Sequence, residues 1–219
     1  LISNVYLDAF DQEMKRRGHR IVRYADDILI LCRTRSAAEH AREVATGILE
    51  GELRLAVNKE KTHLVHASRG VKFLGVEIGL QWIRIQDKKV AAFKAKVKAL
   101  TGRNCSGNLE RVIIDLNPVL RGFANYFGMA TCKNLFATLM SWIRRRLRAK
   151  QLALWKRPGR LHRRLRQLGY QGEFPKIRMT RWRSSRSPQA SWSMPNAWLG
   201  ALGLFDLATV ETGVLPQVT

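Results

Sequence analysis

The stretch RIVRYADDILILC, residues 20–32, places two adjacent aspartates, Asp26 and Asp27, between two short apolar runs. Residues 20–24 and 28–32 are rich in isoleucine, valine and leucine, as is typical of β-strands. Since only Ala25, Asp26 and Asp27 separate the two runs, the pattern predicts a tight hairpin that carries both carboxylates at its tip.

Two interpretations of this acidic tip follow from the residues alone. Neighbouring carboxylates repel each other unless a cation lies between them. Mg²⁺ is a hard ion that enzymes hold with one or two carboxylates and substrate phosphates, and two such ions would stabilise the attacking and leaving oxygens of a phosphoryl transfer. Aspartate is also a favoured turn residue, so the same pair is consistent with a turn that binds no metal.

The flanking residues predict an α+β unit around the hairpin. Apolar residues at helical spacing, Ile2, Val5 and Phe10 among them, predict a helix over residues 1–17. The sequence SAAE at residues 36–39 matches a capping box, so a second helix is expected from there to about residue 53. Short strands are expected at residues 64–66, 71–78 and 82–85.

The second half of the chain shows helical periodicity throughout. A first helix is expected over residues 90–100. A second should break at Asn117-Pro118, because a residue before proline avoids the α-helical region. A long helix should follow over residues 131–155. Past Pro158 the sequence is basic and rich in turn residues, which predicts an irregular tail.

The positive charge is concentrated in one part of the chain. The formal net charge is +22, and residues 140–186 hold 16 Lys and Arg with a single acid, Glu173, whereas residues 1–80 are close to neutral. Such a block repels itself unless an anion neutralises it. A nucleic acid is therefore favoured over a solvated basic face or an anionic membrane surface.

Length and composition exclude several classes of protein. The 219 residues, 46% of them hydrophobic, suffice for one medium or two small folded domains and disfavour disorder. No apolar run approaches the roughly 18–20 residues that cross a bilayer. Three cysteines without a C-x-x-C pair favour a reduced, intracellular protein that has no structural zinc.

Several blocks of sequence together resemble one family. YADD at residues 24–27 resembles the metal-binding motif of the reverse transcriptase palm domain. With NKEKT (58–62) and FLGV (73–76) it resembles the last palm motifs of group II intron reverse transcriptase/maturases. Blocks that resemble the family's helical thumb, or maturase region, and the C-terminal end of its compact bacterial members are LNP (116–118), RGFANYF (121–127), WIRRRL (142–147), PNAW (195–198) and LGL (202–204).

The resemblance implies roles in catalysis and in primer and template binding. Asp26 would be the principal Mg²⁺ ligand and Asp27 its neighbour in the same site. Lys61 would lie near the leaving pyrophosphate, with an ordinary surface lysine as an equal alternative. The primer and template would pass Tyr24, Ala25, Phe73, Leu74 and Gly75. A packing role for Tyr24 and a simple bulge at Gly75 are competing interpretations.

The resemblance also implies that the basic block binds structured RNA, because the planar fork of arginine pairs with phosphates and stacks on bases. The partners implied are intron RNA, a DNA target and primer, and deoxynucleotides, in a cytoplasmic, bacterial ribonucleoprotein without a membrane. The positions expected to contact RNA are Arg144, Arg145, Arg146, Arg148, Lys150, Lys156, Arg157, Arg163, Arg164, Arg181 and Arg183.

The implied fold is α+β: part of a polymerase palm at residues 1–86, a helical thumb or maturase region at 87–157 and a basic extension at 158–219. The family carries a further metal-binding aspartate upstream, together with nucleotide-binding fingers. Asp8 and Asp11 fall on the opening helix and do not match it. We therefore expect an RNA-directed DNA polymerase and splicing maturase, represented by a C-terminal fragment that binds structured RNA but does not polymerise by itself.

Three alternatives stand beside this interpretation. A non-catalytic RNA-binding splicing factor is disfavoured by the intact pair Asp26 and Asp27. A reverse transcriptase of another lineage, retron or CRISPR-associated, is disfavoured by the maturase-like blocks between residues 116 and 147. A basic protein of ribosomal type would leave the carboxylate hairpin unexplained.

Overall fold

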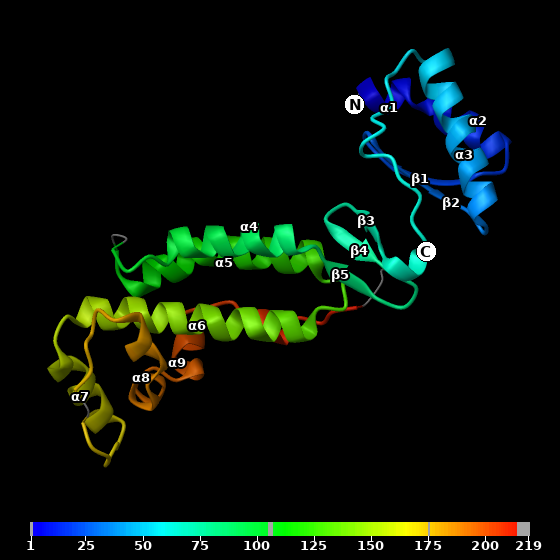
Figure 1. The fold of residues 1–219 in the computed structure, drawn as a ribbon. Helices are drawn as coiled ribbons and strands as arrows, with labels where there is room; N and C mark the ends of the chain where they lie inside the picture. The colour runs from blue at the N-terminus through cyan, green and yellow to red at the C-terminus, as the bar shows by residue number, and fades with distance from the viewer. Residues whose placement is uncertain (1, 105–106, 175, 214–219) are drawn as a thin grey trace. The chain divides into compact units, whose positions relative to one another are not determined.

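The computed structural model describes residues 2–104, 107–174 and 176–213. The chain forms two compact units, Leu1–Gln81 and Trp82–Thr219, called here the N-terminal and C-terminal units (Figure 1). Helices accompany small antiparallel sheets, so the expected α+β class is confirmed at this level. None of the described helices is both long and apolar enough to cross a membrane.

The N-terminal unit is built on helices and the predicted hairpin. Its elements are α1 (Ile2–Tyr6), α2 (Asp8–Arg16), β1 (Arg20–Tyr24), β2 (Asp27–Leu31) and α3 (Arg35–Gly47), which continues as a π-helical turn at Ile48–Glu52. Phe10 and Met14 of α2 are fully buried and pack with Ala45 and Ile48. The apolar face of α2 thus holds the hairpin against α3.

The hairpin has one packed and one open face. In the antiparallel register Ile21 lies opposite Ile30 and Arg23 opposite Ile28, and these inward positions are half-buried. The alternate positions Val22 and Tyr24 are 46% and 65% exposed. Because side chains alternate between faces along a strand, this register leaves Tyr24 and its partner Asp27 on the open face.

The second hairpin joins β3 (Val71–Phe73) to β4 (Val76–Ile78) through Leu74 and Gly75. Both turn residues have positive φ, +48° and +85°, as a type I′ turn requires. Gly75 is therefore explained by turn geometry and not by a bulge. The strand expected at residues 64–66 was wrong: this segment is irregular, and a short 3₁₀ helix follows at Ala67–Arg69.

Two other expectations for the N-terminal unit need correction. The opening helix is divided at Leu7, and Ile2 and Val5 are 87% and 75% exposed, so they are not core residues. Ser36 does not cap α3. The hydroxyl of Thr34 accepts the Ala37 amide hydrogen at 3.2 Å instead, because the helix begins one residue before Ser36.

The C-terminal unit begins with β5 (Ile83–Ile85) and three long helices, α4 (Asp87–Leu100), α5 (Leu109–Phe127) and α6 (Lys133–Trp155) (Figure 1). Phe93 of α4 stacks on Phe123 of α5 with ring centroids 4.0 Å apart. Phe136 of α6 is fully buried beside the same ring. These aromatic contacts join the three helices in one core.

The predicted break at Pro118 was wrong, because α5 runs through it without interruption. Leu116 and Leu120 on either side are fully buried, whereas Pro118 is exposed, so its ring faces away from the core. Asn117 has a separate role. Its Nδ2 donates to the Gly203 carbonyl at 2.8 Å, and its Oδ1 accepts the Phe205 amide hydrogen at 2.9 Å.

Replacing Asn117 by alanine should lower the free energy of unfolding of the C-terminal unit by about 2 kcal/mol, since two hydrogen bonds to backbone groups are lost. The change can be measured by urea denaturation followed by tryptophan fluorescence. Asn125→Ala, at an exposed position of the same helix, is the matched control and should cost much less. Equal losses for both variants would contradict this role.

The segment from Pro158 onward contains several short helices joined by irregular stretches, so it is more ordered than the expected irregular tail. It contains α7 (Pro158–Gln167), a 3₁₀ helix (Trp182–Arg186), α8 (Pro188–Ser193), α9 (Asn196–Ala201) and a second 3₁₀ helix (Leu207–Thr209). Leu161 and Leu165 of α7 pack with Leu152 of α6 and Met194 in one buried cluster, against which Trp155 also packs. Apolar residues spaced between the arginines therefore fold this basic segment onto α6.

Candidate metal site and nucleic-acid interface

The carboxylates lie where the sequence placed them, at an exposed hairpin tip. Ala25 and Asp26 form the two-residue turn, and Asp27 is the first residue of β2, paired with Tyr24. All four side chains are exposed. Within the described part of the chain, neither carboxylate has a hydrogen-bonding or ion-pair partner. Both are therefore available to a ligand.

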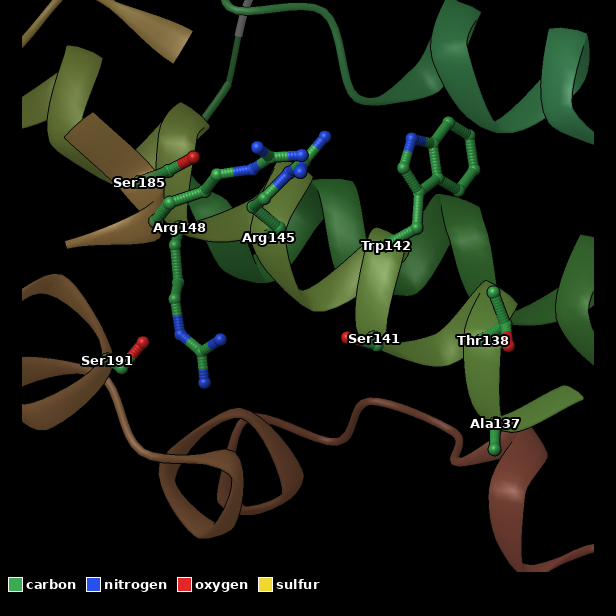
Figure 2. A pocket seen from close by; sticks show the side chains of 9 residues that line it. Ala137, Thr138, Ser141, Trp142, Arg145, Arg148, Ser185 and Ser191 are labelled. Atoms are coloured by element: carbon green, nitrogen blue, oxygen red, sulfur yellow. The ribbon is translucent and has the colours of Figure 1, made fainter. Parts of the chain in front are cut away.

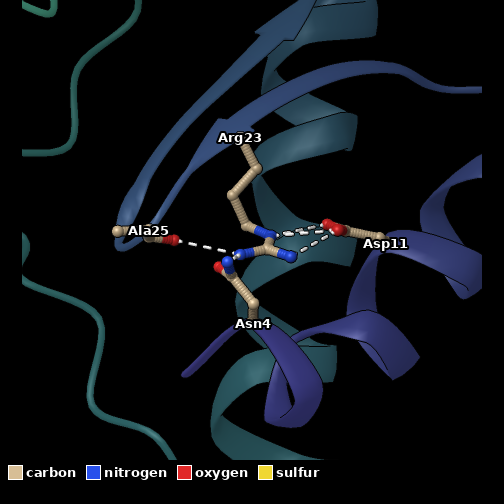
Figure 3. A network of polar contacts seen from close by, with 4 residues as sticks. All are labelled: Asn4, Asp11, Arg23 and Ala25. Carbon is tan, nitrogen blue, oxygen red and sulfur yellow. Dashed lines mark hydrogen bonds and ion pairs between the residues drawn. The ribbon is translucent and has the colours of Figure 1, made fainter. Parts of the chain in front are cut away.

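A polar network behind the tip fixes its position (Figure 3). The Arg23 guanidinium donates to both oxygens of Asp11 on α2, with its Nη2 2.6 Å from Oδ2. Its Nη1 donates to Asn4 Oδ1 at 3.0 Å and to the Ala25 carbonyl at 3.2 Å. The Arg23 side chain thus connects α1 and α2 to the turn that carries Asp26.

This network was not predicted from the sequence. The side chains of Arg23 and Asp11 are only 10% and 17% exposed. The hydrogen bonds that Arg23 donates to Asp11 raise the pKa of the Arg23 guanidinium, which therefore keeps its charge. The available signal was a charged residue at an inward position of an otherwise apolar strand. Such a residue needs a buried partner, and Asp11 supplies it.

The residues at the tip partly fit a divalent metal. The reverse transcriptase motif that residues 24–27 resemble would hold divalent metal ions. Two adjacent carboxylates are hard oxygen ligands, and Mg²⁺ commonly takes one or two of these and completes its octahedron with water and phosphate. No group of three or more His, Cys, Asp or Glu with metal-binding geometry occurs among the described residues. The described part of the tip therefore presents two carboxylates.

The other positions implied for catalysis and primer binding lie in a turn that contains Lys61 and in the β3–β4 hairpin. Lys61 is exposed in a turn organised by Asn58, whose Oδ1 accepts the Lys61 amide hydrogen at 3.1 Å. Phe73 and Leu74 are half-buried and Gly75 is buried in the β3–β4 turn. In the described residues no hydrogen bond or ion pair joins Lys61 to Asp26 or Asp27. Their roles stay predictions.

Several basic residues of α6 hold the C-terminal unit together. Arg144 pairs with Asp206, with Nη2 2.5 Å from Oδ2. Arg146 donates to the Thr101 hydroxyl at 2.5 Å and to the Lys98 carbonyl at 3.3 Å, so it caps the C-terminus of α4. Arg148 donates to the Met194 carbonyl at 2.9 Å and to Asn196 Oδ1 at 2.8 Å.

The remaining basic residues differ in how far their side chains are exposed to solvent. Lys150 is 0% exposed, which argues against the predicted RNA contact, because RNA cannot reach a side chain inside the core. Arg164 is half-buried, with its Nε 3.5 Å from the Ser193 carbonyl and its guanidinium 5.8 Å from the Trp198 ring. The exposed members of the predicted set are Lys156, Arg157, Arg163, Arg181 and Arg183. We call these five residues the exposed basic set.

The last predicted position, Arg145, lies in a pocket between α6 and the 3₁₀ helix at Trp182–Arg186 (Figure 2). Its guanidinium stacks over the Trp182 ring at 4.9 Å, and that of Arg146 lies 5.0 Å from the same ring. Trp182 thus lies near two arginines and is half-buried. Arg186, which is not among the positions expected to contact RNA, also lines the pocket.

Two family models match the chain, in the order of its two units. The model described as reverse transcriptase (RNA-dependent DNA polymerase) matches residues 1–78, and that described as group II intron, maturase-specific domain matches residues 90–169. Protein YkfC of Escherichia coli (strain K12) is 35% identical over 92 residues, which are 42% of this chain and 23% of that protein. The similar stretch thus spans about a quarter of the curated relative.

Proposed function

Because the chain belongs to the group II intron reverse transcriptase/maturase family, we propose that it is part of an RNA-directed DNA polymerase that also helps its intron RNA to fold and splice. Residues 1–86 would be the C-terminal part of the palm and residues 87–157 the thumb or maturase region. Residues 158–219 would extend the basic surface of that region. The partners would be intron RNA, a DNA target and primer, and deoxynucleotides.

The exposed tip with two carboxylates that lack partners is the observation that carries the polymerase part of this proposal. Asp26 and Asp27 would hold Mg²⁺, which when bound stabilises negative charge on the oxygens of a phosphoryl transfer. Arg23 would act as a positioning residue, because it fixes the Ala25 carbonyl next to Asp26. Tyr24 lies exposed beside Asp27, where it could contact a primer end.

The exposed basic set carries the RNA-binding part. Lys156 and Arg157 follow α6, Arg163 lies on α7, and Arg181 and Arg183 lie at the start of the 3₁₀ helix Trp182–Arg186. Buried apolar neighbours hold these elements in place. A guanidinium pairs with phosphate and an ammonium attracts it as a point charge. Structured RNA is therefore the favoured ligand of this surface.

The test of this function is binding of residues 1–219 to a group II intron RNA in competition with an unrelated structured RNA of equal length. We expect the intron RNA to compete more effectively, because a maturase recognises folded shape as well as charge. Equal competition by both RNAs would mean that the surface binds polyanions in general. That result would contradict the maturase proposal.

Residues 1–219 alone should bind an RNA template but fail to extend an annealed DNA primer. The described residues bring only two carboxylates together at the tip, and a metal pair needs a fuller set of ligands. The assay is primer extension with Mg²⁺ and deoxynucleotides, alongside a gel-shift measurement of template binding. Extension that Asp26→Asn abolishes would show that the chain is itself a complete polymerase.

A further inference from the structure

The pocket that contains Arg145 has the chemistry of a phosphate site. It is an open pocket of about 590 Å³ lined by residues of α6, the 3₁₀ helix at Trp182–Arg186 and α8. Three arginines line it, Arg145, Arg148 and Arg186, together with the hydroxyl side chains of Ser141 and Ser191 (Figure 2). No aspartate or glutamate is among the described residues that line it. The pocket therefore gathers positive charge without a carboxylate to neutralise it.

Arg145 has an unmet hydrogen-bonding requirement in this pocket. Its Nε is buried and has no hydrogen-bond partner in the described structure. Burial lowers the pKa of the Arg145 guanidinium, and the neighbouring charge of Arg186 lowers it further. A buried donor without an acceptor is costly, and a second cation beside it adds repulsion. An anion between the two guanidiniums would accept a hydrogen bond from the unpaired donor and would reduce the repulsion between the two positive charges.

In contrast to Arg145, the other arginines of α6 have acceptors for their guanidinium groups. Arg144 is neutralised by Asp206, and Arg146 is satisfied by the end of α4. Arg148 lines the pocket but already donates to the Met194 carbonyl and to Asn196. Among the described residues, Arg145 thus has a buried Nε without a partner, and Arg186 lines the same pocket.

We propose that this pocket binds one phosphate group of the RNA backbone, with its oxygens accepting hydrogen bonds from Arg145 and Arg186. Bidentate pairing of guanidinium with phosphate is strong and directional. The volume lies within the range of small-ligand sites, about 300–1,000 Å³, so a phosphate with its attached ribose fits. The phosphate chemistry stands on the pocket alone, and its assignment to RNA rests on the proposed function.

Inorganic phosphate is the first probe, used with residues 1–219. Phosphate should raise the melting temperature and slow amide hydrogen exchange over residues 182–191. Arg186→Gln should weaken this response about tenfold, since a charged hydrogen bond is lost. Lys94→Gln, which removes a positive charge from an exposed position of α4, is the matched control and should leave the response unchanged. No protection by phosphate, or equal protection of both variants, would overturn the site.

A short single-stranded RNA is the second probe and identifies the source of the phosphate. We expect phosphate to compete with this RNA, and Arg186→Gln to weaken RNA binding about tenfold, with a smaller loss for Lys94→Gln. If phosphate protects the pocket but RNA does not compete with it, the site serves a free anion, and the RNA assignment is overturned. If no RNA binds at all, the proposed function fails, while the phosphate result still decides the site.

Discussion

Replacing Arg23 by alanine is expected to lower the opening free energy of the N-terminal unit by about 3 kcal/mol, because the half-buried Asp11 carboxylate then loses the hydrogen bonds that Arg23 donates to it. The loss should also release the turn, since the Ala25 carbonyl loses its hydrogen bond. Native-state hydrogen exchange of the β1 and β2 amides in residues 1–219 measures this free energy directly.

The matched control for Arg23 is Arg16→Ala. Arg16 also pairs with a carboxylate, that of Glu13, at 2.7 Å, but its side chain is 73% exposed. Hydrogen bonds from Arg16 and Arg17 lower the pKa of Glu13 to about 2, and yet solvent screens such an exposed pair, so little stability depends on it. Equal effects of the two substitutions would show that the Arg23 network does not hold the hairpin.

Binding of residues 1–219 to RNA should weaken steeply with salt. If each member of the exposed basic set neutralises one phosphate, the slope of log affinity against log salt should be about −3.5 to −4.5, a loss of roughly 100-fold or more between about 50 and 200 mM salt. The counter-ions released from the RNA cause this loss. Fluorescence anisotropy with labelled RNA over a salt series gives the slope.

The combined variant Lys156→Gln, Arg157→Gln and Arg163→Gln should reduce the steepness of that slope by about 2 to 3. The control removes the same charge from α4, through Lys94→Gln, Lys96→Gln and Lys98→Gln at exposed positions. The control should change the slope less, because these lysines lie outside the exposed basic set. An equal or larger effect of the control would place the RNA surface on α4 instead.

The local features of the hairpin could be predicted from the sequence, because they depend on neighbouring residues. Two short runs rich in isoleucine, valine and leucine, with a short acidic connection between them, predicted both strands and the tip. Arg23 could not be assigned, because its partners Asn4 and Asp11 lie 19 and 12 residues away in the sequence. Periodicity shows which side of a strand is buried but not which distant group it meets.

In the basic C-terminal unit, too, the partner of a charged side chain could not be predicted from the residues near it in the sequence. The sequence locates the positive charge but does not say which arginines are free to bind a ligand. Arg144 and Arg146 find partners 62 and 45 residues away, so their structural roles depend on the packing of the whole unit. Lys150 was selected as an RNA contact and is buried instead. Folding, and not composition, separates the structural cations from the exposed basic set.

Pro118 shows how packing overrides a local preference. The residue before a proline disfavours the α-helical region, and yet α5 continues through this position. Leu116 and Leu120 bury their side chains on one face, and Asn117 is held by the backbone of Gly203 and Phe205. These tertiary contacts outweigh a local cost, and a window of neighbouring residues does not reveal them.

The most direct test of the metal site is Mn²⁺ titration of residues 1–219, observed by NMR, since Mn²⁺ replaces Mg²⁺ at oxygen sites and broadens nearby signals. We expect the amides of Ala25, Asp26 and Asp27 to broaden first. Asp26→Asn with Asp27→Asn should abolish this effect, while Glu60→Gln, which removes an exposed acid from the same unit, should leave it unchanged. Broadening spread evenly over the acidic residues, or unchanged in the double variant, would contradict a metal-binding hairpin.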